Sequence, residues 1–303
     1  MSDPVIYITG ATASGKSALA MRLANRLGGE IISVDSMQVY CGLNIGTAKP
    51  SAQEQNEIQH HLIDVAQLSE AFDAAQFVSL AQQALKLIWK RGRVPIFCGG
   101  TGLYFRALIE GLGESPPSDE SLRDELAQMP IESLVTELRI KDPEAAKQVD
   151  LKNSRRLLRA IEVIRLTGRP YSEQRIGWNN VDKAPQNLFC ISREVDVLNQ
   201  RIHKRVDEMF NQGLVEETQT LIKKGLRNNR NACQALGYRQ VLDLLDGKLD
   251  LENVVQQVKT KTRQFAKRQR SWFRNQMKCK FLEWPDEENL NSFSEQLLAK
   301  INL

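Results

Sequence analysis

The 303-residue chain lacks the features of a membrane or secreted protein. It has no apolar run of the roughly 18 residues that a membrane helix needs, and residues 1–8 do not have the pattern of a signal peptide. Its five cysteines include no CxxC pair, and its three histidines have no zinc-ligand spacing. These absences argue against a disulfide framework and a zinc site, so we expect a cytoplasmic protein with reduced thiols.

The positive charge of the chain is concentrated in two segments. The net charge is only +4, yet nine basic residues and no acidic one occur between Lys259 and Lys280. Six basic residues against one acidic residue occur in residues 152–169, so the remaining sequence is acidic. This concentration favours a polyanionic partner, and helical faces that only contact solvent are the alternative.

Short buried strands alternate with helices along much of the sequence. Apolar runs at residues 5–9, 30–34, 94–98 and 188–192 predict strands. Helical patterns cover residues 16–27, run from Asp73 to just before Gly92, and run from Asp196, as a cap, to Gly213. The alternation is typical of a parallel sheet with helices on both faces.

A change in the residue pattern after Gly113 marks a second structural unit. Residues 114–118 form a proline-rich linker, and the sequence that follows is helical without buried-strand runs until a loop at residues 182–187. We therefore predict an α/β protein with a P-loop parallel sheet core flanked by helices, made of residues 1–113 and 187–303. Residues 114–186 form a helical insertion subdomain.

Residues 10–17 match the pattern G-x-x-x-x-G-K-[ST], between a predicted strand and a predicted helix, and are called the P-loop below. In this context backbone amides and a helix N-terminus form a nest for phosphate oxygens. Lys16 adds a point charge, and Ser17 is a candidate ligand for Mg²⁺. The residues predicted to bind a phosphate or diphosphate group are Gly10, Ala11, Thr12, Ala13, Ser14, Gly15, Lys16 and Ser17.

The strand at residues 94–98 does not end in the aspartate that NTP hydrolases use around their Mg²⁺. Gly99 and Gly100 stand there instead. The P-loop motif alone is typical of ATP-binding proteins, but this absence weakens the ATPase interpretation. A kinase of a small metabolite stays open.

Asp35 follows the second predicted strand and should lie at the ligand-binding edge of the sheet. A carboxylate beside a diphosphate is repelled by it and is better placed to accept a proton from an attacking nucleophile. The alternative is an aspartate that only caps the following turn.

Further motifs follow the P-loop in order. They are DSMQVY at residues 35–40, NIGTAKP at 44–50, HHLID at 60–64, GGTGLY at 99–104, residues 155–162, ALGYR at 235–239 and TRQFAKRQ at 262–269. With these motifs the chain resembles the bacterial tRNA dimethylallyltransferases (tRNA isopentenyltransferases) over almost its whole length. It departs from the family at Ala11, where proline is usual, and in lacking the zinc finger of eukaryotic members.

The resemblance implies a reaction. The P-loop would hold dimethylallyl diphosphate, and the acceptor would be N6 of the adenosine immediately 3′ of the anticodon in tRNA, giving N6-isopentenyladenosine and pyrophosphate. Asp35 would be the general base, while Thr12, Lys16, Arg205 and Mg²⁺ on Ser17 would stabilise the departing pyrophosphate. Arg201 lies one turn from Arg205, and the sequence does not decide which of the two meets the diphosphate.

The resemblance and the charge pattern also imply contacts to the anticodon stem-loop. Arg263, Lys267, Arg270, Arg274 and Lys278 recur on one face of a predicted helix, which would hold RNA phosphates. Gln38 is a candidate to form hydrogen bonds with the extruded adenine. The other residues expected to bind tRNA are Asp35, Ser36, Met37, Thr101, Arg123, Arg155, Arg156, Leu157, Leu158, Arg159, Cys233, Gly237, Tyr238 and Arg239. We interpret His60 and His61 as structural.

We therefore expect a monomeric transferase whose partners are tRNA and dimethylallyl diphosphate, with Mg²⁺ as its cofactor and no membrane contact. Three alternatives remain open from the sequence. They are a P-loop kinase of a small metabolite, a prenyltransferase acting on free adenine nucleotides, and an RNA-binding module whose P-loop is a structural anion site.

Overall fold

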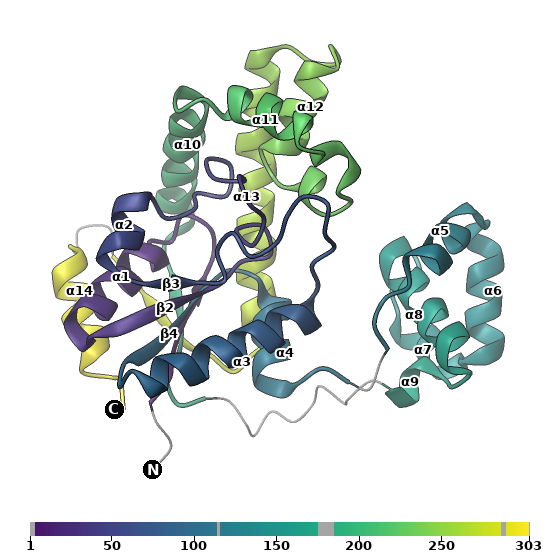
Figure 1. The fold of residues 1–303 in the computed structure, drawn as a ribbon, viewed down its shortest axis with the longest axis horizontal. Helices are drawn as coiled ribbons and strands as arrows, with labels where there is room; N and C mark the ends of the chain where they lie inside the picture. Colours follow the sequence, from purple (N-terminus) through teal and green to yellow (C-terminus); the bar gives the residue numbers. More distant parts are fainter. Residues whose placement is uncertain (1–3, 114–115, 175–184, 286–288, 303) are drawn as a thin grey trace. The chain divides into compact units, whose positions relative to one another are not determined.

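The computed structural model describes residues 4–113, 116–174, 185–285 and 289–302 (Figure 1). Its strands are β1 (Ile6–Gly10), β2 (Gly29–Val34), β3 (His60–His61), β4 (Val94–Gly99), β5 (Leu188–Ser192) and β6 (Lys280–Glu283). The contact pattern divides the chain into a core, Met1–Ile109 with Ala184–Leu303, and an insertion, Glu110–Lys183. These boundaries lie within four residues of the predicted ones.

The core contains most of the helices. They are α1 (Lys16–Leu27), α2 (Ala52–Glu57), α3 (Ala74–Lys90), α4 (Gly102–Glu110), α10 (Val195–Asn211), α11 (Leu214–Lys223), α12 (Tyr238–Leu245), α13 (Leu251–Gln276) and α14 (Leu290–Leu298). The insertion contains α5 (Glu120–Gln128), α6 (Ile131–Lys141), α7 (Pro143–Gln148), α8 (Ser154–Thr167) and α9 (Tyr171–Gln174). Two short 3₁₀ turns lie between α11 and α12, at Leu226–Asn228 and Ala232–Gln234.

The six strands form one parallel sheet in the order β3-β2-β4-β1-β5-β6, which confirms the predicted α/β architecture. Because all strands run the same way, their carboxyl ends meet at one edge. The P-loop follows β1 at this edge, Asp35 follows β2, and Gly100 follows β4. The sheet therefore brings together three segments that are far apart in the sequence.

Each face of the sheet has its own apolar core. Neighbouring residues alternate between the two, since Ile31 belongs to the cluster that includes α1 and α14, and Ile32 to the cluster that includes α3, α4 and α13. Capping supports this arrangement. Asp73 accepts hydrogen bonds from Ala75 N and Gln76 N and so begins α3 where the sequence predicted.

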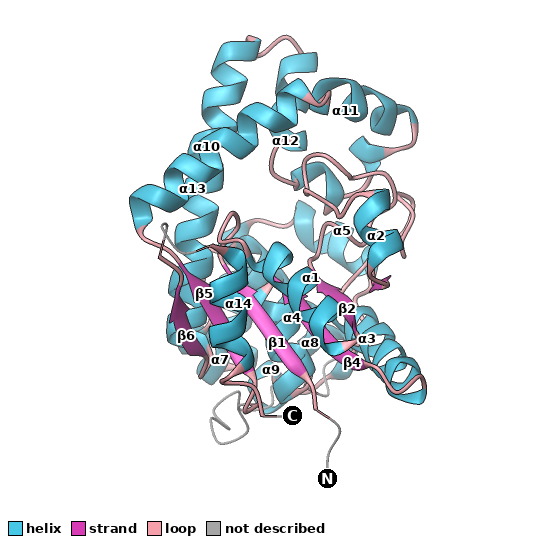
Figure 2. Cartoon of the chain, turned by 90° about the vertical axis from the view of Figure 1, so that its left-hand side faces the viewer, coloured by secondary structure: helices cyan, strands magenta, loops and turns pink. Residues whose placement is uncertain are grey.

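A layer of helices extends beyond the C-terminal edge of the sheet. Helix α13 packs along α10 and against α12, and it also contacts β1. Figure 2 shows α10 and α13 beyond the strand ends, with α11 and α12 toward their far ends. The basic helix of the sequence is therefore part of the core and lies close to the P-loop strand.

Two local predictions were wrong, and two short strands were not predicted. Helix α10 begins after Glu194 rather than Asp196, which lies inside the first turn. Helix α13 ends at Gln276, so Lys278 lies beyond the basic helical face. Strands β3 and β6 were not predicted, because β3 has only two residues and β6 has exposed charged residues at both ends instead of a buried apolar run.

The insertion has an apolar core of its own and a buried ion cluster. The carboxylate of Glu162 on α8 is fully buried, accepts a hydrogen bond from Asp119 N at 2.8 Å and pairs with Arg123 at 2.9 Å and Arg159 at 2.7 Å. Arg159 also donates to Pro116 O at 2.5 Å. One buried carboxylate therefore joins α5, α8 and the segment that leads into α5.

In the part of the chain that the structure describes, no helix is both long enough and apolar enough to cross a membrane.

Glu162→Ala should destabilise the insertion by about 1–3 kcal/mol, because it leaves two guanidinium groups and the Asp119 amide without their acceptor. Thermal unfolding followed by circular dichroism measures the effect. Glu132→Ala is the control, since Glu132 is exposed on α6. Equal stability of the two variants would remove the structural role of the cluster.

Candidate functional site

Two left-handed residues shape the P-loop. Ala13 has φ 63° and Gly15, which precedes α1, has φ 96°. A Cβ atom at Gly15 would also lie 2.8 Å from the Trp284 ring, so only glycine fits there. The turn aims the amides at the start of α1 toward the space in front of the loop, where an anion can accept them.

Side chains from other elements hold the backbone of the P-loop. Arg201 of α10 donates from Nε to Ala13 O at 2.8 Å, and Arg193 donates from Nε to Ser14 O at 3.0 Å. The Arg193 guanidinium is buried and lies 4.2 Å over the ring of Trp284.

Two more bonds complete this set. Lys16 Nζ donates to Ala11 O at 3.2 Å, and Thr12 N donates to Gln269 Oε1 of α13 at 2.8 Å. Each of these hydrogen bonds occupies a backbone carbonyl or amide of the loop and so fixes the conformation of the loop.

The cationic side of the site is a cavity of about 330 Å³ between the P-loop and α10. It is lined by Ala13, Gly15, Lys16, Ser17, Ala18, Arg201, Lys204, Arg205 and Glu208. Burial lowers the pKa of Lys16, and the nearby Arg205 lowers it further, while Asp35 opposes these effects. Burial also lowers the pKa of Arg205, again opposed by Asp35. Two cations held close together in a cavity favour binding of a dianionic or trianionic group.

The structure separates Arg201 from Arg205. Arg201 is exposed and its Nε is bonded to Ala13 O, which holds the loop. Arg205 is more buried, and it interacts electrostatically with both Lys16 and Asp35. Its burial and its place beside Lys16 in the cavity lining favour Arg205 as the direct contact to an anion.

Asp35 caps a turn and still has acceptor capacity. Its Oδ1 accepts hydrogen bonds from Met37 N at 2.8 Å and Gln38 N at 3.3 Å. Asp35 therefore caps the turn that follows β2, the role that the sequence offered as the alternative to a base. Both of the hydrogen bonds described for Asp35 use Oδ1, so Oδ2 can still accept a further hydrogen bond. Thr101 Oγ1 accepts from Ser36 N at 3.0 Å and so joins this turn to the turn after β4.

The amide of Gln38 is used within the protein. Oε1 accepts from Ser33 Oγ at 2.8 Å, and Nε2 donates to Thr47 O and Ala48 O, both at 3.2 Å. Gln38 thus holds the segment at residues 44–50 against β2. An adenine would have to share or replace these bonds.

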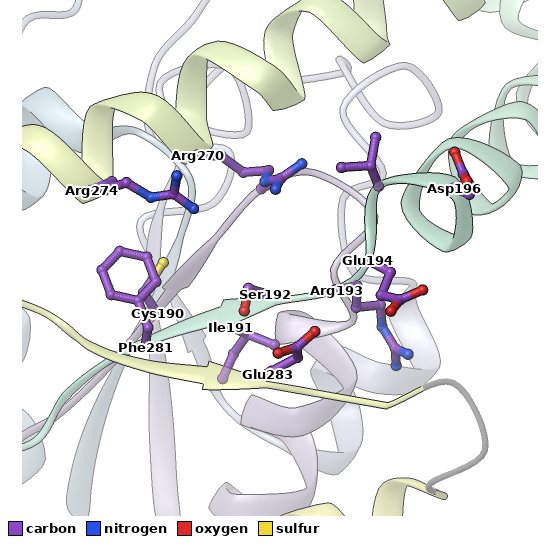
Figure 3. A pocket seen from close by; sticks show the side chains of 12 residues that line it. Cys190, Ile191, Ser192, Arg193, Glu194, Asp196, Arg270, Arg274, Phe281 and Glu283 are labelled. Atoms are coloured by element: carbon purple, nitrogen blue, oxygen red, sulfur yellow. The ribbon is translucent and has the colours of Figure 1, made fainter.

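A second cavity, of about 510 Å³, lies on the other side of the P-loop. Ala11 lines it together with β5, the segment at residues 193–196 and β6. Figure 3 shows Arg270 and Arg274 extending from α13 over this cavity, toward the strand ends that carry Ser192 and Glu283. The basic helix therefore reaches the P-loop directly.

The basic residues of α13 differ from those of the insertion in their pairing. Among the described ion pairs, the nine basic residues from Lys259 to Lys280 make one, between Lys259 and Asp207 at 2.6 Å. Arg263 and Lys267 are exposed on the same helix. In the insertion, by contrast, Arg123, Arg159 and Arg165 are all paired with glutamates.

Several residues expected to contact tRNA are buried, so those predictions were wrong. Leu157 is fully buried in the insertion core. Tyr238 is fully buried as well, and its hydroxyl donates to Glu217 at 2.6 Å and accepts from Gly46 N at 3.1 Å. Gly237 is also buried, beside Leu214.

Arg123 and Arg159 belong to the Glu162 cluster, which gives them a structural role. The remaining residues keep at least partly accessible side chains; they are Ser36, Met37, Thr101, Arg155, Arg156, Leu158, Cys233 and Arg239.

Two residues at the site were not singled out from the sequence. Arg193 follows β5 and Gln269 lies in the basic helix, and each bonds to the P-loop. The signal for Gln269 was its place in the TRQFAKRQ motif, but the sequence could not indicate that its side chain points inward while its neighbours are more accessible.

The residues present fit Mg²⁺ only together with a phosphate. Among the described residues, no cluster of three or more His, Cys, Asp or Glu side chains could hold a metal ion. Ser17 is exposed and lines the cavity beside Lys16. Since Mg²⁺ commonly combines one or two protein ligands with substrate oxygens and water, Ser17 can serve as such a ligand.

These features define a class: parallel α/β proteins whose first strand leads through a glycine-rich loop into the first helix, with cations beside that loop. A family model described as IPP transferase matches residues 38–276. The chain belongs to this family of transferases, as its motifs indicated.

Named relatives agree with this assignment. A tRNA dimethylallyltransferase of Geobacillus thermodenitrificans is 40% identical and covers 99% of the chain and 97% of its own length. "tRNA dimethylallyltransferase 1" of Trichlorobacter lovleyi is 43% identical over 94% of the chain and 95% of the relative.

Solved structures are similar too. A tRNA isopentenylpyrophosphate transferase of Bacillus halodurans has a TM-score of 0.71 at 38% identity, covering 99% of this chain and 97% of that one. A eukaryotic dimethylallyltransferase acting on tRNA has a TM-score of 0.81 at 29% identity, covering 97% and 77%.

Arg205→Ala should weaken binding of inorganic pyrophosphate by roughly 10- to 100-fold, since a hydrogen bond to a charged group contributes about 1.5–3 kcal/mol. Isothermal titration calorimetry measures the change. Gln200→Ala is the control, because Gln200 is exposed on the same helix and does not line the cavity. Unchanged affinity in Arg205→Ala would leave Arg201 as the candidate.

Proposed function

We propose that this enzyme transfers a dimethylallyl group from dimethylallyl diphosphate to N6 of the adenosine immediately 3′ of the anticodon in tRNA. The products are N6-isopentenyladenosine and pyrophosphate. The observation that carries the proposal is the meeting of Asp35 with the cations Lys16 and Arg205 at one edge of the sheet, beside the accessible basic residues of α13.

The reaction requires a leaving group and a base in one place. The adenosine N6 attacks the allylic carbon, the bond from that carbon to the diphosphate oxygen breaks, and Asp35 takes the N6 proton. Lys16, Arg205, Thr12 and the amides at the start of α1 receive the charge that develops on the pyrophosphate. An exocyclic amine is a weak nucleophile, so positioning of both reactants contributes to the rate.

Mg²⁺ bound at Ser17 would offset part of the diphosphate charge. Ser17 would supply one oxygen ligand to the ion, while Lys16 and the loop amides would bind phosphate oxygens of the donor.

The substrate that fits the basic helix is RNA. The cations on α13 without described ion-pair partners match a phosphate backbone, and Arg270 and Arg274 continue this charge to the cavity beside Ala11. The target base has to leave its stack in the anticodon loop to reach Asp35. A free adenine nucleotide would not need this surface.

We expect a monomer that acts in the cytoplasm.

The kinase alternative is weakened by the end of β4. A Cβ atom at Gly99 would lie 2.0 Å from Val34 O, and one at Gly100 would lie 2.3 Å from Gln269 Nε2. Neither position can carry the carboxylate that P-loop NTPases place there without moving its neighbour.

Asp35→Asn tests the reaction most sharply, because the amide oxygen can still cap the turn while the base is lost. Wild-type protein with Mg²⁺, undermodified tRNA and radiolabelled dimethylallyl diphosphate should label tRNA at the adenosine beside the anticodon. The variant should be slower by roughly 10²- to 10⁴-fold with nearly unchanged tRNA affinity.

A parallel reaction with ATP distinguishes the proposed transferase from a kinase and from an RNA-binding module. ATP consumption without label in tRNA would favour a kinase. Binding of tRNA without transfer from any prenyl donor would favour an RNA-binding module.

Replacing Arg263, Lys267 and Arg270 with glutamine should weaken tRNA binding and flatten its salt dependence. Each lost phosphate contact lowers the slope of log affinity against log salt by roughly 0.7–0.9. Filter binding at several salt concentrations measures both effects. A matched control replaces three exposed basic residues on or next to α3, which are Lys86, Lys90 and Arg93. Equal slopes in the two triple variants would remove α13 from the interface.

A further inference from the structure

Gln269 is a buried polar residue within the basic part of α13. Its two sequence neighbours, Arg268 and Arg270, are both more accessible, while Gln269 is only 7% exposed. A buried amide needs partners for its oxygen and its nitrogen, since an unpaired polar group in the interior is costly.

Both ends of this amide are bonded to opposite sides of the site. Oε1 accepts the hydrogen of Thr12 N at 2.8 Å, and Nε2 donates to Gly100 O at 2.9 Å. One partner is a backbone donor and the other a backbone acceptor, so the orientation of the amide is fixed by its surroundings.

The geometry around Gly100 is built for this side chain. A Cβ atom at Gly100 would lie 2.3 Å from Gln269 Nε2, so any other residue would displace the amide. The next residue, Thr101, accepts the hydrogen bond of Ser36 N, and Ser36 follows Asp35. A short hydrogen-bonded path thus runs from the P-loop through Gln269 to the turn that carries the base.

Gln269 differs from the other side chains that hold the P-loop. Arg193 follows β5 and Arg201 lies on α10, whereas among the described hydrogen bonds the contact from α13 to the loop is that of Gln269. Any shift of α13 is therefore transmitted to the Thr12 amide through this bond.

We propose that Gln269 is a positioning residue that couples occupancy of the basic helix by tRNA to the affinity of the P-loop for the diphosphate. This inference rests on the proposed function. Coupling between two ligands is reciprocal and commonly amounts to a 5- to 150-fold change in affinity. The P-loop would therefore bind the donor more tightly when the acceptor RNA is in place.

Calorimetry with inorganic pyrophosphate, with and without saturating undermodified tRNA, tests the proposal. In the wild type, tRNA should tighten pyrophosphate binding by at least about fivefold. In Gln269→Met, which keeps the length but loses both bonds, that factor should fall to within twofold of unity. Gln264→Met is the matched control, because Gln264 is exposed on the same helix and should retain the wild-type factor.

A second variant keeps the test decisive if Gln269→Met does not fold. Gly100→Ala displaces the amide from its other side without changing α13, and it should lose the coupling in the same way. A wild-type coupling factor in either folded variant overturns the proposal, as does a wild type that binds both ligands independently. Prenyl transfer to tRNA in that last case would leave the proposed function intact, whereas absence of transfer would contradict the proposed function itself.

Discussion

The backbone of the P-loop is held in place by hydrogen bonds from side chains that the sequence places far away. Arg193 follows β5, Arg201 lies on α10 and Gln269 on α13, and each bonds to a different residue of the loop. An anion nest works only if its amides already point in the right direction, because reorganising them on binding would reduce affinity. The P-loop site therefore depends on the docking of the helices that pack beyond the sheet.

Pairing of charges divides the basic residues into two groups with different uses. Arg123, Arg159 and Arg165 in the insertion meet glutamates and stabilise that unit. The cations on α13 have few described partners, and two of them extend over the cavity next to the P-loop. The same composition thus supports folding in one unit and, we propose, RNA binding in the other. Only the partners of each side chain reveal the difference.

Much of the fold could be predicted because its signals are local. The four main strands are apolar runs, and α3 begins at a capping aspartate, so each is defined by residues within a few positions. Strand β6 escaped prediction because it gains its place only by pairing with β5. The burial of Tyr238 escaped for the same reason, since its partners Glu217 and Gly46 come from other parts of the chain.

The sequence by itself determined the parallel α/β core, the P-loop and the candidate base Asp35, because a motif fixes residue types at fixed local spacing. It also determined the family, through several motifs in order. The tertiary structure decided that Arg201 bonds to the P-loop backbone while Arg205 is more buried beside Lys16, and which basic residues are already paired. It also decided that Gln269 points inward to the P-loop. These outcomes depend on distances between elements far apart in the chain, and such distances are set by packing of the whole core, which no local pattern encodes.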